Sequence, residues 1–337
     1  MSIEASPIAA PRMEPLTVVD KRSLNHAELC HELALISRAV ARACADYLVH
    51  ARTVVDAQTT SEKESHHDPV TVFDREVETA VSQMLAHLVP GCMKLGEEHG
   101  EETLIPQSSE PSLPDGISMP AIEPHIDVRS LGSRVRWIVD PIDGTSNFAA
   151  GLTDFNTSIA AELDGEVVAG AVHVPCACET FWGNDHAGWL ESSQGFFALD
   201  SSGPSREEDA ILLTYFPLVS ELERYPQDAL QVLSELSQAF RAVRRPGAAA
   251  LDLAHIAAGR AGAFFATALK PWDIAAGAHL LRVAGGAVID APLDTDTPPG
   301  FGPAVAASAK GLDAPTLPRA LKLVERARRA SSSPAAQ

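Results

Sequence analysis

The residues whose types and spacing could support catalysis are carboxylates that follow a short apolar strand. Residues 136–139 are predicted as a buried strand that leads directly into Asp-Pro-Ile-Asp-Gly-Thr at 140–145. Asp140 and Asp143 lie three residues apart, so both carboxylates can face one point with the Ile142 carbonyl between them. Mg²⁺ prefers such oxygen ligands. We therefore predict a magnesium site; the alternative is an Asp-rich turn whose acids only bond to the backbone.

The residues that follow this pair are suited to hold a phosphate. Gly144 permits close backbone approach, and the amides of Gly144 and Thr145 can face an anion where the next turn begins. We therefore expect these two residues to contact the phosphate of a substrate.

Three other places present acidic residues beside glycine or at the ends of elements. They are Gly-Glu-Glu at 96–98, Asp273 after Trp272, and Asp68 with Asp74. Each has a simpler interpretation: a solvated acidic pair, a helix N-cap at Asp273, and a helix N-cap at Asp74. Asp68 could act as a base that orients a water.

These carboxylates come from distant parts of the chain and would repel one another in a cleft of low dielectric. Two or three divalent cations offset that repulsion. We therefore predict an arrangement that is stable only with metal.

The elements that must position these side chains follow from hydrophobic periodicity. Asp164-Gly165 between two apolar runs predicts a hairpin. The alternation of helix and strand in the second half indicates an α/β layer. We expect helices at 27–48, 74–88, 228–240, 248–258 and 273–284, and strands at 136–139, 158–163, 166–174, 263–265 and 287–289.

The same pass along the chain predicts a division into domains. The 103–134 segment, rich in Pro and Ser, is predicted as an insertion loop that shapes the pocket rim or a dimer contact, or is only solvated. We expect a disordered tail at 1–25, an N-terminal α+β half with most metal ligands at 26–185, a C-terminal α/β half at 186–325 and a flexible tail at 326–337.

Composition excludes several classes of function. The chain of 337 residues carries 26 Lys and Arg against 45 Asp and Glu, a net charge of −19, so we expect no nucleic-acid partner and no anionic membrane partner. No stretch approaches the ~20 apolar residues of a membrane helix, and the N-terminus does not resemble a signal peptide. The five cysteines are not spaced as a zinc site or a disulfide framework. Cys176 and Cys178 are predicted as small apolar residues of a strand, and the compartment as cytoplasmic.

Taken together, the motifs resemble the inositol monophosphatase superfamily, lithium-sensitive and magnesium-dependent phosphatases. The resemblance spans residues 27–312, and its most specific part is the Asp-Pro-Ile-Asp-Gly-Thr box. It implies a layered αβαβα sandwich of the sugar-phosphatase type, a homodimer, and hydrolysis of a small phosphate monoester by metal-activated water.

The resemblance also implies roles for individual residues. Glu97, Asp140 and the Ile142 carbonyl would hold one Mg²⁺, and Asp140, Asp143 and Asp273 a second, with a weaker third ion near Glu97. Further roles would fall to the amides of Gly144 and Thr145 as phosphate contacts, to Asp68 and the Thr145 hydroxyl in deprotonating the attacking water, and to Lys63 as the mobile-loop lysine.

Two positions depart from the family pattern and bear on the substrate. The acidic residue that grips inositol hydroxyls in family members is Ala266 here, and the Gly-Ser/Thr-Ala stretch is Gly247-Ala248-Ala249. Losing hydroxyl acceptors weakens the case for inositol itself. Fructose 1,6-bisphosphate and 3′(2′),5′-bisphosphate nucleotides therefore stay open as substrates, and an inactive regulatory homologue is the non-enzymatic alternative.

Overall fold

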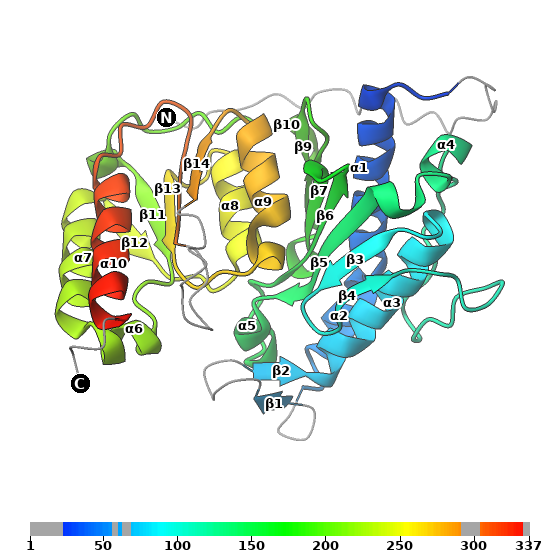
Figure 1. Cartoon of the computed structure of the whole chain (residues 1–337), viewed down its shortest axis with the longest axis horizontal. Coiled ribbons are helices and arrows are strands. Elements are labelled where there is room, and N and C mark those ends of the chain that lie inside the picture. Colours follow the sequence, from blue (N-terminus) through cyan, green and yellow to red (C-terminus); the bar gives the residue numbers. More distant parts are fainter. Residues whose placement is uncertain (1–22, 56–59, 63–68, 291–303, 333–337) are drawn as a thin grey trace. The chain divides into compact units, whose positions relative to one another are not determined.

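A computed structural model describes residues 23–55, 60–62, 69–290 and 304–332 (Figure 1). Contacts divide the chain into two compact units. The first comprises Met1–Leu199, Gly247–Leu251 and Trp272–Val283, and the second Asp200–Pro246, Asp252–Pro271 and Ala284–Gln337. The predicted division into halves at 185/186 stays a prediction.

An eight-stranded sheet, with strand order β10-β9-β8-β7-β6-β5-β3-β4, is the framework of the first unit. Neighbouring strands are antiparallel except β3 and β5, which run parallel. The strands are β3 (Met93–Gly96), β4 (Gly100–Thr103), β5 (Val135–Asp143), β6 (Asn156–Leu163), β7 (Glu166–Val174), β8 (Glu179–Gly183), β9 (Gly188–Ser192) and β10 (Gly195–Ala198).

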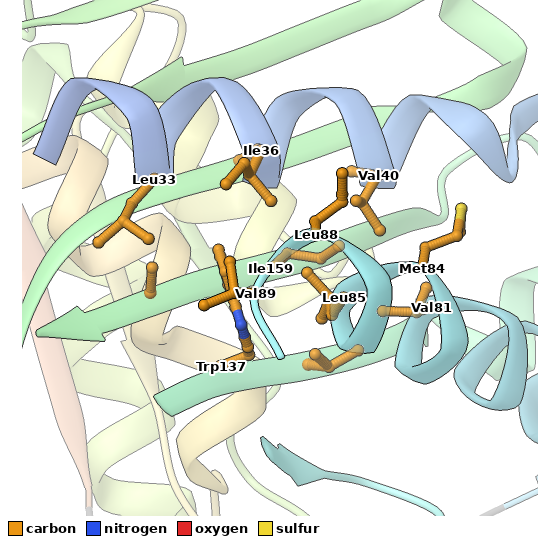
Figure 2. Close-up of a cluster of buried hydrophobic side chains, with 14 of the residues drawn as sticks. Leu33, Ile36, Val40, Val81, Met84, Leu85, Leu88, Val89, Trp137 and Ile159 are labelled. Carbon is orange, nitrogen blue, oxygen red and sulfur yellow. The ribbon is translucent and has the colours of Figure 1, made fainter. Parts of the chain in front are cut away.

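Two amphipathic helices cover one face of this sheet. α1 (His26–Ala43) contacts β6, β7 and β8, and α3 (Val72–Leu88) contacts β5. Figure 2 shows the apolar side chains between them, which come from every third or fourth residue of each helix. The labelled ones are Leu33, Ile36, Val40, Val81, Met84, Leu85, Leu88, Val89, Trp137 and Ile159.

The opposite face of the sheet is packed by α9 (Pro271–Val283). Ala169 and Ala171 of β7 belong to the core beneath α1, so Gly170 between them faces the other way. A Cβ at Gly170 would lie 3.1 Å from Ala276 Cα of α9. Glycine is therefore needed where this helix approaches the strand.

The remaining elements of the first unit are short. β1 (Thr60–Glu62) pairs antiparallel with β2 (Pro69–Thr71). The others are α2 (Ala45–Ala51), α4 (Ile126–Arg129), α5 (Thr145–Ala149) and the 3₁₀ turns η1 (Gly132–Arg134) and η2 (Pro175–Ala177).

A five-stranded mixed sheet, with order β12-β11-β13-β15-β14, forms the second unit. Its core contains apolar side chains of α7, α10 and strands β11, β13 and β15. The elements are η3 (Glu207–Asp209), β11 (Ile211–Thr214), α6 (Val219–Arg224), α7 (Pro226–Ala239), β12 (Ala242–Arg244), α8 (Ala249–Ala257, which begins in the first unit), β13 (Ala263–Ala266), β14 (Ala287–Asp290), β15 (Val305–Ser308) and α10 (Thr316–Ser332).

Several local predictions are confirmed and others are wrong. The hairpin at Asp164-Gly165 joins β6 to β7, and both residues have the positive φ that a tight hairpin turn uses. Cys176 and Cys178 do not lie in a strand, because the chain turns there through η2 and Cys178 has φ 51°. Residues 326–332, expected to be flexible, continue α10, whose Val324 and Ala327 are buried.

The predicted insertion at 103–134 is not a purely solvated loop. Leu104, Ile117, Val128 and Leu131 are buried in the core of the first unit, which anchors the segment at several points. Among the described residues, no helix has both the length and the apolar composition to cross a membrane.

Candidate active site

Strand pairing places Glu97 and Asp140 next to each other. In the parallel pair β3–β5, Gly96 is opposite Val139, so the residues that follow them, Glu97 and Asp140, stand at neighbouring positions of one sheet edge. Parallel strands end at the same edge, so this proximity follows from the register alone.

Asp140 lies at the centre of the carboxylates predicted from the sequence. Its side chain is buried, and its Oδ1 accepts a hydrogen bond from the Ile142 amide at 3.0 Å. Burial raises the pKa of Asp140 well above its ordinary value, and the nearby charges of Glu97, Asp143 and Asp273 raise it further. Glu97, Asp143 and Asp273 therefore lie near enough to Asp140 to affect its pKa, and their shared role as metal ligands stays a prediction.

Several hydrogen-bond donors orient the Asp143 carboxylate. Asn156 Nδ2 donates to its Oδ2 at 2.7 Å, and the first amides of α8, from Ala249 and Ala250, donate to its two oxygens at 2.9 and 2.8 Å. Burial raises the pKa of Asp143 to about 6, although these hydrogen bonds to the carboxylate act in the opposite direction. Asp143 is thus both buried and fixed in position.

The pairing of β5 with β6 is interrupted after Asp140 and resumes at Asp143. β5 continues to Asp143, with a shift of register between Asp140 and Asp143 in its pairing with β6. The Thr157 hydroxyl donates to the Pro141 carbonyl at 3.0 Å and holds the irregular segment. Such a bulge re-aims side chains, which is compatible with the prediction that Asp140 and Asp143 face one point.

Asp273 reaches the site from the first turn of α9. The helix begins at Pro271, so Asp273 is its third residue and not the N-cap that we had considered. The absence of a side chain at Gly170 on β7 lets α9 pack close to the sheet.

A buried ion pair that the sequence analysis missed holds the turn that carries Glu97. Glu78 of α3 and Lys94 of β3 are both fully buried, and Lys94 Nζ donates to Glu78 Oε1 at 2.7 Å. The amides of Glu98 and His99, which belong to the β3–β4 turn, donate to the same carboxylate at 2.7 and 3.0 Å. The only signal in the sequence was a lysine within an otherwise apolar strand.

Thr145 begins α5 directly after Gly144. Gly144 has φ 92°, and a Cβ there would lie 3.0 Å from the Asp154 carbonyl oxygen, so both backbone angle and space require glycine. The Thr145 hydroxyl lies 3.1 Å from Asp74 Oδ1 and 2.9 Å from the Ile142 carbonyl oxygen. It can donate to either one.

Asp74 is a second residue whose role the sequence analysis missed. It is not the N-cap of α3: that residue is Thr71, and Asp74 completes a capping box by accepting the Thr71 amide on Oδ2 at 2.7 Å. Its Oδ1 faces Thr145. Burial raises the pKa of Asp74 to about 6, with Glu97 and Glu98 also contributing. The Thr-x-x-Asp spacing at 71–74 was the signal that could have identified the box.

Two predicted site residues, Lys63 and Asp68, lie outside the described residues. Ala266, the position predicted to bear on the substrate, is a buried residue of β13 in the second unit.

The donor set fits hard divalent cations. Glu97, Asp140, Asp143 and Asp273 offer only oxygen, and the pKa of Asp140 is raised by its acidic neighbours as well as by burial. Buried carboxylates of like charge are stabilised when a cation is shared among them. The chemistry of these side chains thus suits a hard divalent cation, and Mg²⁺ at this cluster stays a prediction.

Comparison with known proteins shows the family of this chain. The profile of the inositol monophosphatase family matches residues 30–326. An inositol-1-monophosphatase of Mycobacterium bovis is 35% identical over 252 residues, which are 74% of this chain and 77% of that protein. The Nus factor SuhB of Escherichia coli is 30% identical over 77% of this chain and 85% of its own length.

Solved structures show the same fold. Mycobacterium tuberculosis SuhB is similar with a TM-score of 0.62 and 28% identity, over 88% of this chain and 97% of that one. The IMPase of Thermotoga maritima, at 24% identity and a TM-score of 0.61, matches 89% of this chain and 97% of its own and supports the fold alone. The predicted fold class is confirmed, and the chain belongs to the inositol monophosphatase family.

Proposed function

We propose that the protein is a magnesium-dependent phosphatase that hydrolyses a small phosphate monoester by attack of water. The observation that carries this proposal is the convergence of Glu97, Asp143 and Asp273 on the buried Asp140. Phosphoryl transfer depends mainly on positioning and on neutralising charge, and a cluster of oxygen ligands supplies both when cations occupy it.

The ligand assignment follows the prediction from the sequence. Glu97, Asp140 and the Ile142 carbonyl would hold one Mg²⁺, and Asp140, Asp143 and Asp273 a second; a third would lie near Glu97. When bound, the ions lower the pKa of water and stabilise the charge on the attacking and leaving oxygens.

The residues of the chain would move the proton. We place the Thr145 hydroxyl as the acceptor of a proton from the attacking water, while its own hydrogen passes to Asp74 Oδ1, 3.1 Å away. A carboxylate whose pKa is raised to about 6 is a better base than an ordinary aspartate, which supports Asp74 in this role. Asp68, the base predicted from the sequence, stays a prediction, as do Lys63 and the amides of Gly144 and Thr145 as phosphate contacts.

For the substrate we propose a compound similar to inositol 1-phosphate. The name of the M. bovis relative, an inositol-1-monophosphatase, supports this class. Ala266 in place of an acidic residue keeps fructose 1,6-bisphosphate and 3′(2′),5′-bisphosphate nucleotides as alternatives. The homodimer and the cytoplasmic location also stay predictions.

The test is release of inorganic phosphate by the purified protein from inositol 1-phosphate, fructose 1,6-bisphosphate and a 3′,5′-bisphosphate nucleotide, with and without Mg²⁺ and Li⁺. We expect turnover only with Mg²⁺, highest on inositol 1-phosphate, inhibition by Li⁺, and loss of turnover in Asp140→Asn. Asp115→Asn, at an exposed position, is the matched control. Phosphate release without Mg²⁺, or equal release by Asp140→Asn, would contradict the proposal.

A non-catalytic role is the second candidate, because relatives at 30% identity are named as Nus factors. The non-catalytic role would replace the phosphatase proposal if no phosphate monoester is hydrolysed and Asp140→Asn leaves every measured property of the protein unchanged.

A further inference from the structure

A second cluster of metal-ligating side chains lies at the start of α1. His26 and Cys30 are four residues apart and share one helix face, and Asp185 belongs to the turn between β8 and β9. Among the described residues, these are the three side chains of His, Cys, Asp or Glu type whose ligand atoms all lie within 4.8 Å of one another. In Figure 1 the start of α1 is at the top of the view, whereas α5, which carries Thr145, is near the bottom.

The separations match the edges of a tetrahedral zinc site. Cys30 Sγ lies 3.4 Å from His26 Nε2, which lies 3.6 Å from Asp185 Oδ2. With Zn–S near 2.3 Å, Zn–N and Zn–O near 2.0 Å and tetrahedral angles, sulfur and nitrogen ligands lie about 3.5 Å apart, and nitrogen and oxygen ligands about 3.3 Å. The side chains therefore need little movement to share one ion.

A candidate fourth ligand, His186, lies outside this group of three and would have to move toward it to bind the same ion. His186 Nε2 lies 3.6 Å from the same Asp185 oxygen, and His186 is an exposed residue of the same turn. A thiolate and a carboxylate together balance the charge of a divalent cation, and two neutral imidazoles complete the set.

The turn that carries Asp185 and His186 is held in place by Asn184. The Asn184 side-chain oxygen accepts the amides of His186 and Ala187, each at 3.0 Å, and its backbone carbonyl accepts a hydrogen bond from His279 Nε2 at 3.0 Å. Fixed ligands lose little conformational freedom when an ion binds, which favours a preformed site.

The hydrogen bonding of the Asp185 carboxylate is incomplete within the described residues. Asp185 Oδ1 is buried and has no hydrogen-bond partner within the described part of the chain. A buried carboxylate oxygen in that state is costly, and a cation on the carboxylate would compensate it.

We propose that His26, Cys30, Asp185 and His186 form a site for Zn²⁺ or a similar borderline-soft cation, separate from the carboxylate cluster. Sulfur and nitrogen ligands disfavour Mg²⁺. The Cys30 thiol hydrogen-bonds to Asp185, and burial together with Asp185 raises its pKa to about 12. Binding of the ion therefore displaces the thiol proton to solvent, as at other thiolate sites.

The test uses the reduced full-length protein after treatment with a chelator, titrated with Co²⁺ in excess Mg²⁺ so that the carboxylate cluster is occupied. We expect a thiolate-to-cobalt charge-transfer band that saturates at one equivalent per chain and is displaced by Zn²⁺. Cys30→Ser should abolish the band. Asp185→Asn and His26→Ala should weaken Co²⁺ binding at least tenfold; His26 is 65% exposed, so its replacement preserves the fold.

Three other thiols serve as controls. Cys44, the residue that caps the C-terminus of α1, is also buried, and its Sγ lies 3.8 Å from the Val40 carbonyl oxygen, so Cys44→Ser should keep the band. Cys176→Ser with Cys178→Ser removes the more accessible thiols and should keep it as well. A band lost in the Cys176/Cys178 variant and kept in Cys30→Ser overturns the proposal. Absence of any band in the folded wild type reduces the cluster to a hydrogen-bond network and overturns it too.

Discussion

At the scale of single residues, the contact that bears most on the proposed chemistry is that of the Thr145 hydroxyl with Asp74. One oxygen of Asp74 completes the capping box of α3, which fixes the carboxyl group, and the other faces Thr145. The hydrogen bond by which Asp74 caps α3 thus also orients Asp74 as a candidate base.

Thr145→Ala and Asp74→Asn should each lower kcat by about 10²–10⁴-fold, the usual effect of losing a general base, while KM changes little. Steady-state phosphate release measures this. Thr145→Ser keeps the hydroxyl and should retain most of the activity. Thr79→Ala is the control, since its hydroxyl donates to the Arg75 carbonyl on the exposed side of α3. Wild-type turnover in Thr145→Ala would remove Thr145 from the mechanism.

The sequence pointed to the acidic residues that lie near Asp140 but not to their hydrogen-bond partners. Glu97, Asp140, Asp143 and Asp273 were identified because each stands beside a glycine or at the end of an element. The sequence predicts Asp74 only as a helix cap, because spacing shows that a carboxylate can reach the backbone but not where its second oxygen points.

At the scale of elements, the buried pair Glu78–Lys94 connects α3 to the β3–β4 turn. Glu78 accepts from Lys94 and from two turn amides, so the helix holds the turn that carries Glu97. Gly96 is required there, because a Cβ would lie 2.2 Å from Glu78 Oε1.

Lys94→Met should leave the buried Glu78 carboxylate without its cation and lower the free energy of unfolding by about 3–5 kcal/mol. Urea unfolding measures the change, and the Mg²⁺ concentration needed for half-maximal activity should rise because the Glu97 turn loosens. Arg319→Ala breaks an ion pair with Glu235 in which the arginine is 67% exposed, and should cost about 1 kcal/mol or less. Equal effects of the two substitutions would show that the buried pair has no special role.

Periodicity predicted most of the helices and the β6–β7 hairpin, because these depend on local pattern and on turn residues. It did not predict the parallel pairing of β3 with β5 or the amides of α8 that bind Asp143. Both are tertiary contacts between segments distant in the chain, and no local pattern encodes them.

At the scale of the whole molecule, the metal ligands are not confined to one stretch of the chain. A division by residue number puts Asp273 in the C-terminal half, whereas its contacts group Trp272–Val283 with the eight-stranded sheet. Gly170 and Gly183 make that grouping possible, since a Cβ at either would lie 3.1 Å from an atom of α9.

The metal-free protein should lose stability as pH rises. Burial raises the pKa of Asp143 from 3.8 to about 6, so between these values the folded state binds more protons than the unfolded state. The free energy of unfolding therefore falls across this window, by roughly 3 kcal/mol for such a group. Thermal melts of chelator-treated protein at pH 4, 5 and 7 measure the trend, and Mg²⁺ should reverse it at pH 7.

Asp140→Asn removes one of the repelling charges and supplies the matched variant. It should melt at a higher temperature than the metal-free wild type at pH 7 and gain less from Mg²⁺. Asp115→Asn, at an exposed position, should behave as the wild type does. If Asp140→Asn instead lowers the melting temperature at pH 7, the carboxylates do not repel one another as argued.

The register of β3 against β5 determines how far apart Glu97 and Asp140 lie. Trp137 and Val139 point into the core beneath α1 and α3, so sliding β5 by a single residue would turn both away from this core, to the opposite face of the sheet. Packing of these two side chains in the core therefore fixes the strand register, and with it the spacing between Glu97 and Asp140. Divergent relatives that change every contact around the substrate but keep these two core side chains would inherit the same distance between the acids.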